Sequence, residues 1–185
     1  EGAFEAIRTG QTHYTASNGI PELRKAVCDY YERQFGLKYD PAEVVVGSGA
    51  KPLLYAVLAC LINPGDEVIV FTPAWVSYIE QIRLFDGVEV LIDTSGTNYI
   101  PDLAQLEKAI TPRTKCIMIN TPNNPTGAVY DAATLKGIAK LALRHNIPIL
   151  YDEIYERMVY DGAKHENIVS LCPEVRDLTI LINGV

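Results

Sequence analysis

The stretch NTPNNPTG at 120–127 combines amide side chains with residues that restrict the backbone. Pro122 and Pro125 fix backbone φ angles on either side of Asn123 and Asn124, and the closing glycine tolerates a positive φ. A tight turn after an apolar strand uses the same residue types, so a purely structural turn is one interpretation. The other is a binding site, because rigid neighbours hold an amide side chain in one place. The residues alone leave both interpretations open.

A carboxylate follows a second apolar run, IPILY at 147–151, directly at Asp152. A carboxylate at the end of a buried strand is costly unless it is paired. A helix cap or an ion pair within the protein would serve, and so would a bound cation such as a pyridinium ring. Tyr155 comes three residues later and either packs there or reaches the same ligand.

Two further segments contain residues suited to a flat, anionic ligand. GSGAK at 47–51 places small residues before a predicted helix, whose first backbone N–H groups bind anions. The segment lacks the Walker pattern and the third glycine of a dinucleotide fingerprint, so a plain tight turn is the alternative. Trp75, the single tryptophan, either anchors packing or offers a flat face on which a planar ring can stack.

Short apolar runs alternate with helical patterns along the chain. The runs predict strands at 43–50, 66–71, 88–92, 115–119, 147–153 and 178–182. The intervening patterns predict helices at 20–36, 51–62, 77–85, 102–110 and 131–145, and the apolar residues all round 51–62 predict a buried helix. Strands that are apolar on both faces predict an α/β fold with a mostly parallel sheet covered by helices on both faces. Ligands of such folds bind where the strands end, which is where all the segments above lie.

Composition and charge exclude several classes of protein. The 185 residues are 48% hydrophobic and 21% charged, which suits one globular domain. A net charge of −7 argues against a nucleic-acid or anionic-membrane partner, and no apolar run approaches the roughly 20 residues of a membrane span. The four cysteines are widely separated, which predicts free thiols in a reducing cytoplasm and no metal site. The first residues, EGAFEAIRTG, contain no initiator Met or signal peptide, and we expect them to belong to a longer protein.

Taken together, the motifs resemble those of the class I and II aminotransferases, which are pyridoxal-phosphate (PLP) enzymes of fold type I. The resemblance rests on Tyr14, Gly19 and the Leu-Arg pair at 23–24, and on GSGAK, NPGDEVIVFTPAWVSY, NTPNNPTG and YDEIYE. It covers essentially the whole chain, and PAWVSY is most similar to the bacterial and archaeal aspartate-aminotransferase-like branch. The implied activity transfers an amino group between an amino acid, with aspartate-like or aromatic ones favoured, and a 2-oxo acid.

The resemblance also implies a role for each candidate residue. Asn124 binds the 3′ oxygen of PLP and shares it with Tyr155, while Asp152 pairs with the pyridine nitrogen. Trp75 stacks on the ring. The phosphate is held at the helix N-terminus by Gly49, Ala50 and Lys51. Tyr14 reaches the phosphate of the neighbouring subunit, which implies a homodimer with shared active sites.

Other parts of such an enzyme are expected to lie outside this chain. By the resemblance, residues 1–185 are the central part of the PLP-binding large domain, without the N-terminal segment and the C-terminal small domain. The Schiff-base lysine would follow LINGV at 181–185, and the chain alone is expected to be inactive. The alternatives are another PLP enzyme of this fold such as a carbon–sulfur lyase, the aminotransferase-like effector domain of a transcription regulator, or a module that only folds and binds cofactor.

Overall fold

The computed structural model describes residues 1–184, which form two compact units. The first unit is Glu1–Gly47, and the second begins at Ser48. Within the described residues, no helix is both long enough and apolar enough to cross a membrane.

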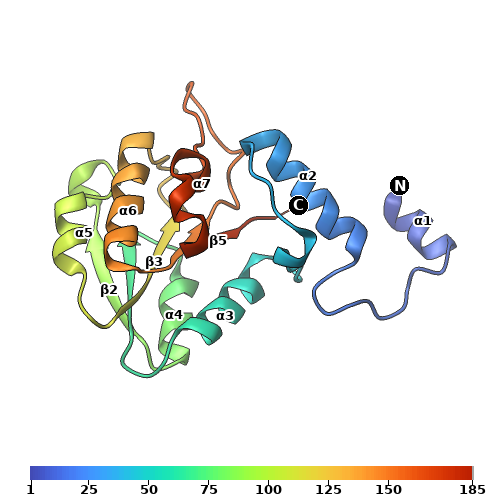
Figure 1. Ribbon diagram of the computed structural model, residues 1–185, viewed down its shortest axis with the longest axis horizontal. Helices are drawn as coiled ribbons and strands as arrows, with labels where there is room; N and C mark the ends of the chain where they lie inside the picture. The colour runs from blue at the N-terminus through green and yellow to red at the C-terminus, as the bar shows by residue number, and fades with distance from the viewer. Residues whose placement is uncertain (185) are drawn as a thin grey trace. The chain divides into compact units, whose positions relative to one another are not determined.

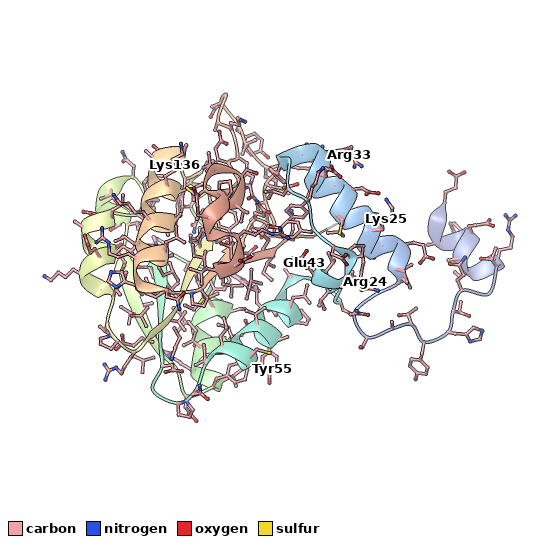
Figure 2. The ribbon with its side chains drawn as sticks, in the orientation of Figure 1. Arg24, Lys25, Arg33, Glu43, Tyr55 and Lys136 are labelled. Atoms are coloured by element: carbon pink, nitrogen blue, oxygen red, sulfur yellow. The ribbon has the colours of Figure 1, made fainter. Side chains whose placement is uncertain are left out.

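The first unit contains two helices, α1 (Gly2–Arg8) and α2 (Pro21–Phe35), and the short 3-10 helix η1 (Pro41–Glu43). Helix α2 begins with a proline at its first position and ends at Gly36, whose φ is 70°, as the sequence predicts. The Arg24 guanidinium, on α2, donates to the Pro41 carbonyl at 3.0 Å (Figure 2). Gly19 has a φ of 96°, and a Cβ there would lie 2.7 Å from the Cβ of Val46. Two residues of the Tyr14-Gly19-Leu-Arg motif thus shape this unit.

The strand predicted at 43–50 is wrong. Val44 has an extended backbone, with φ −108° and ψ 129°, but residues 44–47 pair with no strand in the described part of the chain. Val46 instead donates its N–H to the Asn18 carbonyl at 3.1 Å. A run of valines favours extended backbone, but a sheet strand also needs a neighbouring strand with which to pair.

The second unit contains a five-stranded parallel sheet (Figure 1). Its spatial order is β2-β1-β3-β4-β5. The strands are β1 (Glu67–Thr72), β2 (Val88–Asp93), β3 (Thr114–Asn120), β4 (Ile149–Asp152) and β5 (Thr179–Ile182). The helices are α3 (Ala50–Leu61), α4 (Val76–Leu84), α5 (Leu103–Ala109), α6 (Ala132–His145) and α7 (Ile168–Leu171), with 3-10 helices η2 (Ser95–Thr97) and η3 (Pro173–Leu178). The predicted α/β class and the other five predicted strands are confirmed.

Helices cover both faces of this sheet because the chain reverses direction across it. The connection from β1 to β2 runs toward one edge of the sheet. The connections from β2 to β3, from β3 to β4 and from β4 to β5 run toward the opposite edge. Parallel crossovers are right-handed, so the reversal puts α4 on one face and α5, α6 and α7 on the other (Figure 1). Val68 and Val70 pack with residues of α3 and α4, while the alternating Ile69 is also fully buried.

Helix α3 is not the buried helix that its composition predicts. Of its side chains, only Leu54 and Leu58 are buried, and they join the core under the sheet. Tyr55 lies on the outer side of α3, where it is 46% exposed and its ring packs 5.0 Å from that of Phe85 (Figure 2). An apolar pattern all round a helix shows that every side can be buried, but neighbouring elements decide which sides are covered.

Candidate active site

The carboxyl ends of β1, β3 and β4 lead into the segments that the sequence singled out. Trp75 follows β1 and directly precedes α4, the 120–127 turn leaves β3, and Asp152 is the last residue of β4. Strands of a parallel sheet all end at the same edge, so these segments gather there.

Asp152 is almost completely buried, at 3% exposure, and both of its carboxylate oxygens accept hydrogen bonds. The Tyr78 hydroxyl donates to Oδ2 at 2.6 Å, and the Ile154 N–H donates to Oδ1 at 3.1 Å. Burial raises the pKa of Asp152, and these two hydrogen bonds to the carboxylate partly offset that rise. No Lys, Arg or His of the described chain forms an ion pair with Asp152. A bound cation is therefore the partner that this carboxylate can still take.

Tyr78 is a site residue that the sequence reasoning missed. It lies on α4, is 3% exposed, and stands 74 residues from Asp152 in the chain. Burial, followed by the nearby carboxylate, raises the pKa of the Tyr78 hydroxyl, which keeps its proton available for donation. The available signal was its place in PAWVSY, three residues after Trp75 and hence on the same side of one helix turn.

We expect Tyr78→Phe to raise the pKa of the Asp152 carboxyl further in the cofactor-free protein. The substitution removes a hydrogen bond to the charged form and leaves the burial unchanged. Carbon-13 NMR of labelled aspartate carboxyls would follow the titration, with Tyr160→Phe, at a 74% exposed tyrosine, as the matched control. An Asp152 titration that is identical in Tyr78→Phe and in the control would contradict this role.

The two adjacent asparagines of the turn have different tasks. Asn123 works inside the turn, where its Oδ1 accepts from the Thr126 hydroxyl at 2.8 Å and from the Thr126 N–H at 3.2 Å. Asn124 directs its Nδ2 outward to the Tyr155 hydroxyl at 3.4 Å. Asn123 therefore stabilises the turn itself, whereas cofactor binding by Asn124 stays a prediction.

Asn120 is a second residue that the sequence reasoning passed over. It is the last residue of β3, is 5% exposed, and pairs in register with Asp152. Its side chain contacts the main chain of both Asn124 and Asp152. The signal was simple, because Asn120 is the first polar residue after the apolar run at 116–119.

Trp75 and Lys51 lie against each other. The Lys51 ammonium is 4.7 Å from the centre of the Trp75 ring, and that ring meets Tyr78 edge-on with 5.4 Å between centroids. The indole is only partly buried against the core, so it is held in position while retaining an open surface. The contacts join Lys51 of the GSGAK segment, Trp75 and, through Tyr78, the buried Asp152 carboxylate.

The N-terminus of α3 suits an anion. Gly49 caps the helix with a φ of 98°, which favours glycine, and it provides no side-chain hydrogen bond to the first turn. The first N–H groups of this 12-residue helix have no acceptor from a capping side chain, and the helix dipole favours negative charge there. Gly49, Ala50 and Lys51 thus have the chemistry of a phosphate cradle.

Tyr14 belongs to the other compact unit, outside helix and strand, and its side chain is fully exposed. Among the residues predicted for the site, Asn124 hydrogen-bonds Tyr155 and is connected to Asp152 through Asn120, and Lys51 contacts Trp75. The cofactor-binding roles of these residues, and that of Tyr14, stay predictions.

Behind Asp152, the next carboxylate is buried in a polar network of its own. Glu153 is 0% exposed and lies 2.7 Å from the His165 Nε2, and the Asn167 side chain donates to both of its carboxylate oxygens. A carboxylate oxygen of Glu156, a carboxylate oxygen of Glu153 and a ring nitrogen of His165 all lie within 4.8 Å of one another. These contacts tie the segment that carries Tyr155 to residues more than ten positions later.

Comparisons with known proteins show which proteins this chain resembles. The profile of the family Aminotransferase class I and II matches residues 5–184. The chain is 47% identical to the aspartate aminotransferase of Bacillus sp. (strain YM-2) over 186 residues, and 44% identical to the aspartate/prephenate aminotransferase of Cereibacter sphaeroides over 187 residues. These alignments cover 100% and 99% of this chain but 47% and 46% of those proteins, so the chain spans about half their length.

A solved structure shows the same likeness. The aspartate aminotransferase of Rhizobium meliloti superposes with a TM-score of 0.96 at 39% identity, covering 99% of this chain and 46% of that one.

Proposed function

The chain belongs to the class I and II aminotransferases, and from this premise we propose that the full-length protein moves an amino group between an amino acid and a 2-oxo acid. The observation that carries the proposal is Asp152, a buried carboxylate without a cationic partner in the described chain, at the strand end beside Asn124 and Tyr155. Aspartate-like or aromatic amino acids are the favoured substrates, in keeping with the names of the related proteins.

The residues present fit PLP, the cofactor of this family. Asp152 is acceptor-only when ionised, and a carboxylate has more acceptor sites than the two that Tyr78 and Ile154 occupy. Asn124 and Tyr155 offer an amide and a hydroxyl for the 3′ oxygen. The start of α3 suits the phosphate, and Trp75 suits the flat ring. When bound, PLP supplies an electron sink for bonds at the substrate α-carbon.

The chain's own residues then have separate tasks. Asp152 stabilises a protonated ring nitrogen, because an anion in a site of low dielectric favours a nearby cation. Tyr78 fixes the direction of that carboxylate. Asn124 and Tyr155 fix the 3′ oxygen, and Gly49, Ala50 and Lys51 fix the phosphate. We propose that the complete protein is a homodimer and that it works in a reducing compartment such as the cytoplasm, where its four free cysteines would persist.

The test is a transamination assay on the purified full-length protein with PLP. We expect L-aspartate and 2-oxoglutarate to give oxaloacetate and glutamate, and a parallel reaction with L-phenylalanine measures the preference for aromatic substrates. Release of ammonia and a thiol from a cysteine-type substrate, with no amino transfer from any amino acid, would overturn the proposal in favour of a lyase.

The 185-residue chain alone should show no transamination. By the family resemblance, none of its eight lysines stands at the Schiff-base position, and such chemistry needs a nucleophilic amine and a proton shuttle. The check is to add PLP, reduce with borohydride and map any modified lysine while assaying amino transfer. Stoichiometric modification of one lysine together with turnover would show that another lysine performs the task.

A further inference from the structure

We propose that Asn120 is a positioning residue that fixes the spacing between Asn124 and Asp152. This inference rests on the proposed function, in which these two residues hold different atoms of one cofactor ring: the 3′ oxygen and the ring nitrogen. Because the ring is rigid, its two partners must keep a constant separation, to within roughly 0.5 Å for a preorganised site.

The Asn120 side chain bridges the two residues directly. Its Oδ1 accepts from the Asn124 N–H at 2.7 Å, and its Nδ2 donates to the Asp152 carbonyl at 3.1 Å. The same Asp152 carbonyl accepts from the Thr121 N–H at 3.2 Å, so the bridge extends the β3–β4 ladder by one side-chain bond. Both strands end here, and the Asn120 side chain adds a second connection to β4 that reaches further into the turn, to Asn124.

Only a side chain with an acceptor at one end and a donor at the other can make this bridge. The Asn124 N–H needs an acceptor and the Asp152 carbonyl needs a donor, which sets the orientation of the amide. Aspartate has the same shape but no donor when ionised, and serine is too short to reach both groups. Asn120 is also 5% exposed, so water does not readily replace a lost partner.

The neighbouring Asn123 provides a matched control within the same turn. Its Oδ1 accepts from two groups of Thr126, and an aspartate oxygen can accept in the same way. Asn→Asp at 123 therefore adds the same negative charge near the site as Asn→Asp at 120, while keeping the hydrogen bonds on which that turn depends.

The experiment measures the equilibrium binding of PLP to cofactor-free full-length protein carrying Asn120→Asp, Asn120→Ser or Asn123→Asp. We expect Asn120→Asp and Asn120→Ser to weaken PLP binding by about tenfold or more, and Asn123→Asp to stay within about twofold of wild type. Circular dichroism verifies the fold, and Asn120→Ser is neutral, so it provides the test if the added charge prevents Asn120→Asp from folding.

A cofactor analogue distinguishes positioning from general loosening of the structure. Removing the 3′ oxygen, as in 3-deoxypyridoxal phosphate, should weaken binding to wild type more than to the Asn120 variants, because Asn124 is no longer aimed at that oxygen in the variants. The inference about Asn120 would be overturned if removing the 3′ oxygen weakened binding equally in wild type and variants, or if folded Asn120 variants bound PLP as wild type does. Either result would leave the proposed function standing. A wild-type protein that binds no PLP would overturn the proposed function on which it rests.

Discussion

Replacing Asp152 by asparagine should lower transamination by the full-length protein about a hundredfold or more while making the cofactor-free protein more stable at neutral pH. The loss of activity follows from the chemistry of the ring nitrogen, whose protonated form needs a nearby anion. Asparagine has nearly the same volume but no charge, so the strongest electrostatic partner of that cation is lost. Steady-state assays measure the loss, and unchanged turnover would remove Asp152 from this role.

The gain in stability follows from the pKa of Asp152, which burial raises in the folded protein. The folded state then holds this proton to a higher pH than the unfolded chain, so wild-type stability falls as pH rises from the unfolded value of about 3.9 through the folded value. Asparagine does not titrate and loses nothing over this interval. The Tyr78 hydroxyl can donate or accept, so it keeps a partner in the variant.

Urea unfolding of the cofactor-free protein between about pH 4 and pH 7 measures this difference, which should grow with pH. Asp131→Asn is the matched control, because Asp131 caps α6 and its hydrogen bonds to Thr134 lower its pKa. The stabilising contribution of Asp131 is present above its unfolded pKa and lost at lower pH. Asp131→Asn should therefore lower the free energy of unfolding near pH 7, where Asp152→Asn raises it, and it should leave turnover unchanged. A stability difference for Asp152→Asn that does not vary with pH would contradict the argument.

A cofactor analogue methylated at its ring nitrogen gives a separate check on activity. Its ring keeps a positive charge at every pH, so it does not need a carboxylate to hold a proton. We expect this analogue to restore part of the turnover of Asp152→Asn, and to be no better than PLP in wild type.

If Tyr14 serves the partner's site and its loss weakens activity strongly, mixing Tyr14→Phe with Asp152→Asn should restore about a quarter of wild-type activity. A hybrid of a Tyr14→Phe subunit and an Asp152→Asn subunit would combine both defects in one site and leave the other intact. Random reassociation makes about half of the dimers hybrids, each with one working site of two. The Tyr14 ring is fully exposed, and Phe4 and Ile7 are 80% and 66% exposed, so this segment is accessible to a second subunit.

Activity assays after denaturation and joint refolding measure this recovery, and each variant refolded with itself is the control. Recovery no greater than the sum of the two controls would mean that Tyr14 acts within its own subunit, or that the protein is not a dimer.

Most strands and most of the longer helices could be predicted from the sequence because local pattern and tertiary environment agree in them. The apolar runs of β1, β3 and β4 are buried on both faces, so they appear as continuous hydrophobic segments. Helix α2 begins with Pro21 at its first position and ends at Gly36, and α6 begins after the capping residue Asp131 and ends at Asn146. Short helices such as α1 and α7 lack a long periodic pattern, so no pattern in the sequence predicts them.

The predicted strand at 43–50 and the predicted burial of α3 failed for a common reason. Both depend on what lies beside a segment rather than on the segment itself. Val44 is extended without a strand partner, and Tyr55 is exposed on a helix that is apolar nearly all round. Composition determines whether a surface can be buried, whereas neighbouring elements determine whether it is.

The sequence by itself determined that Asp152, Asn124 and Trp75 follow buried strands and therefore meet at one edge of a parallel sheet. Only the tertiary structure decided which side chain touches which. Tyr78 reaches Asp152 across 74 residues, and Asn120 reaches the Asp152 carbonyl across 32. Those contacts depend on the register that pairs Asn120 with Asp152, and on how α4 packs against the sheet. A shift of one residue would turn each side chain to the opposite face, and no local pattern around either residue encodes that register.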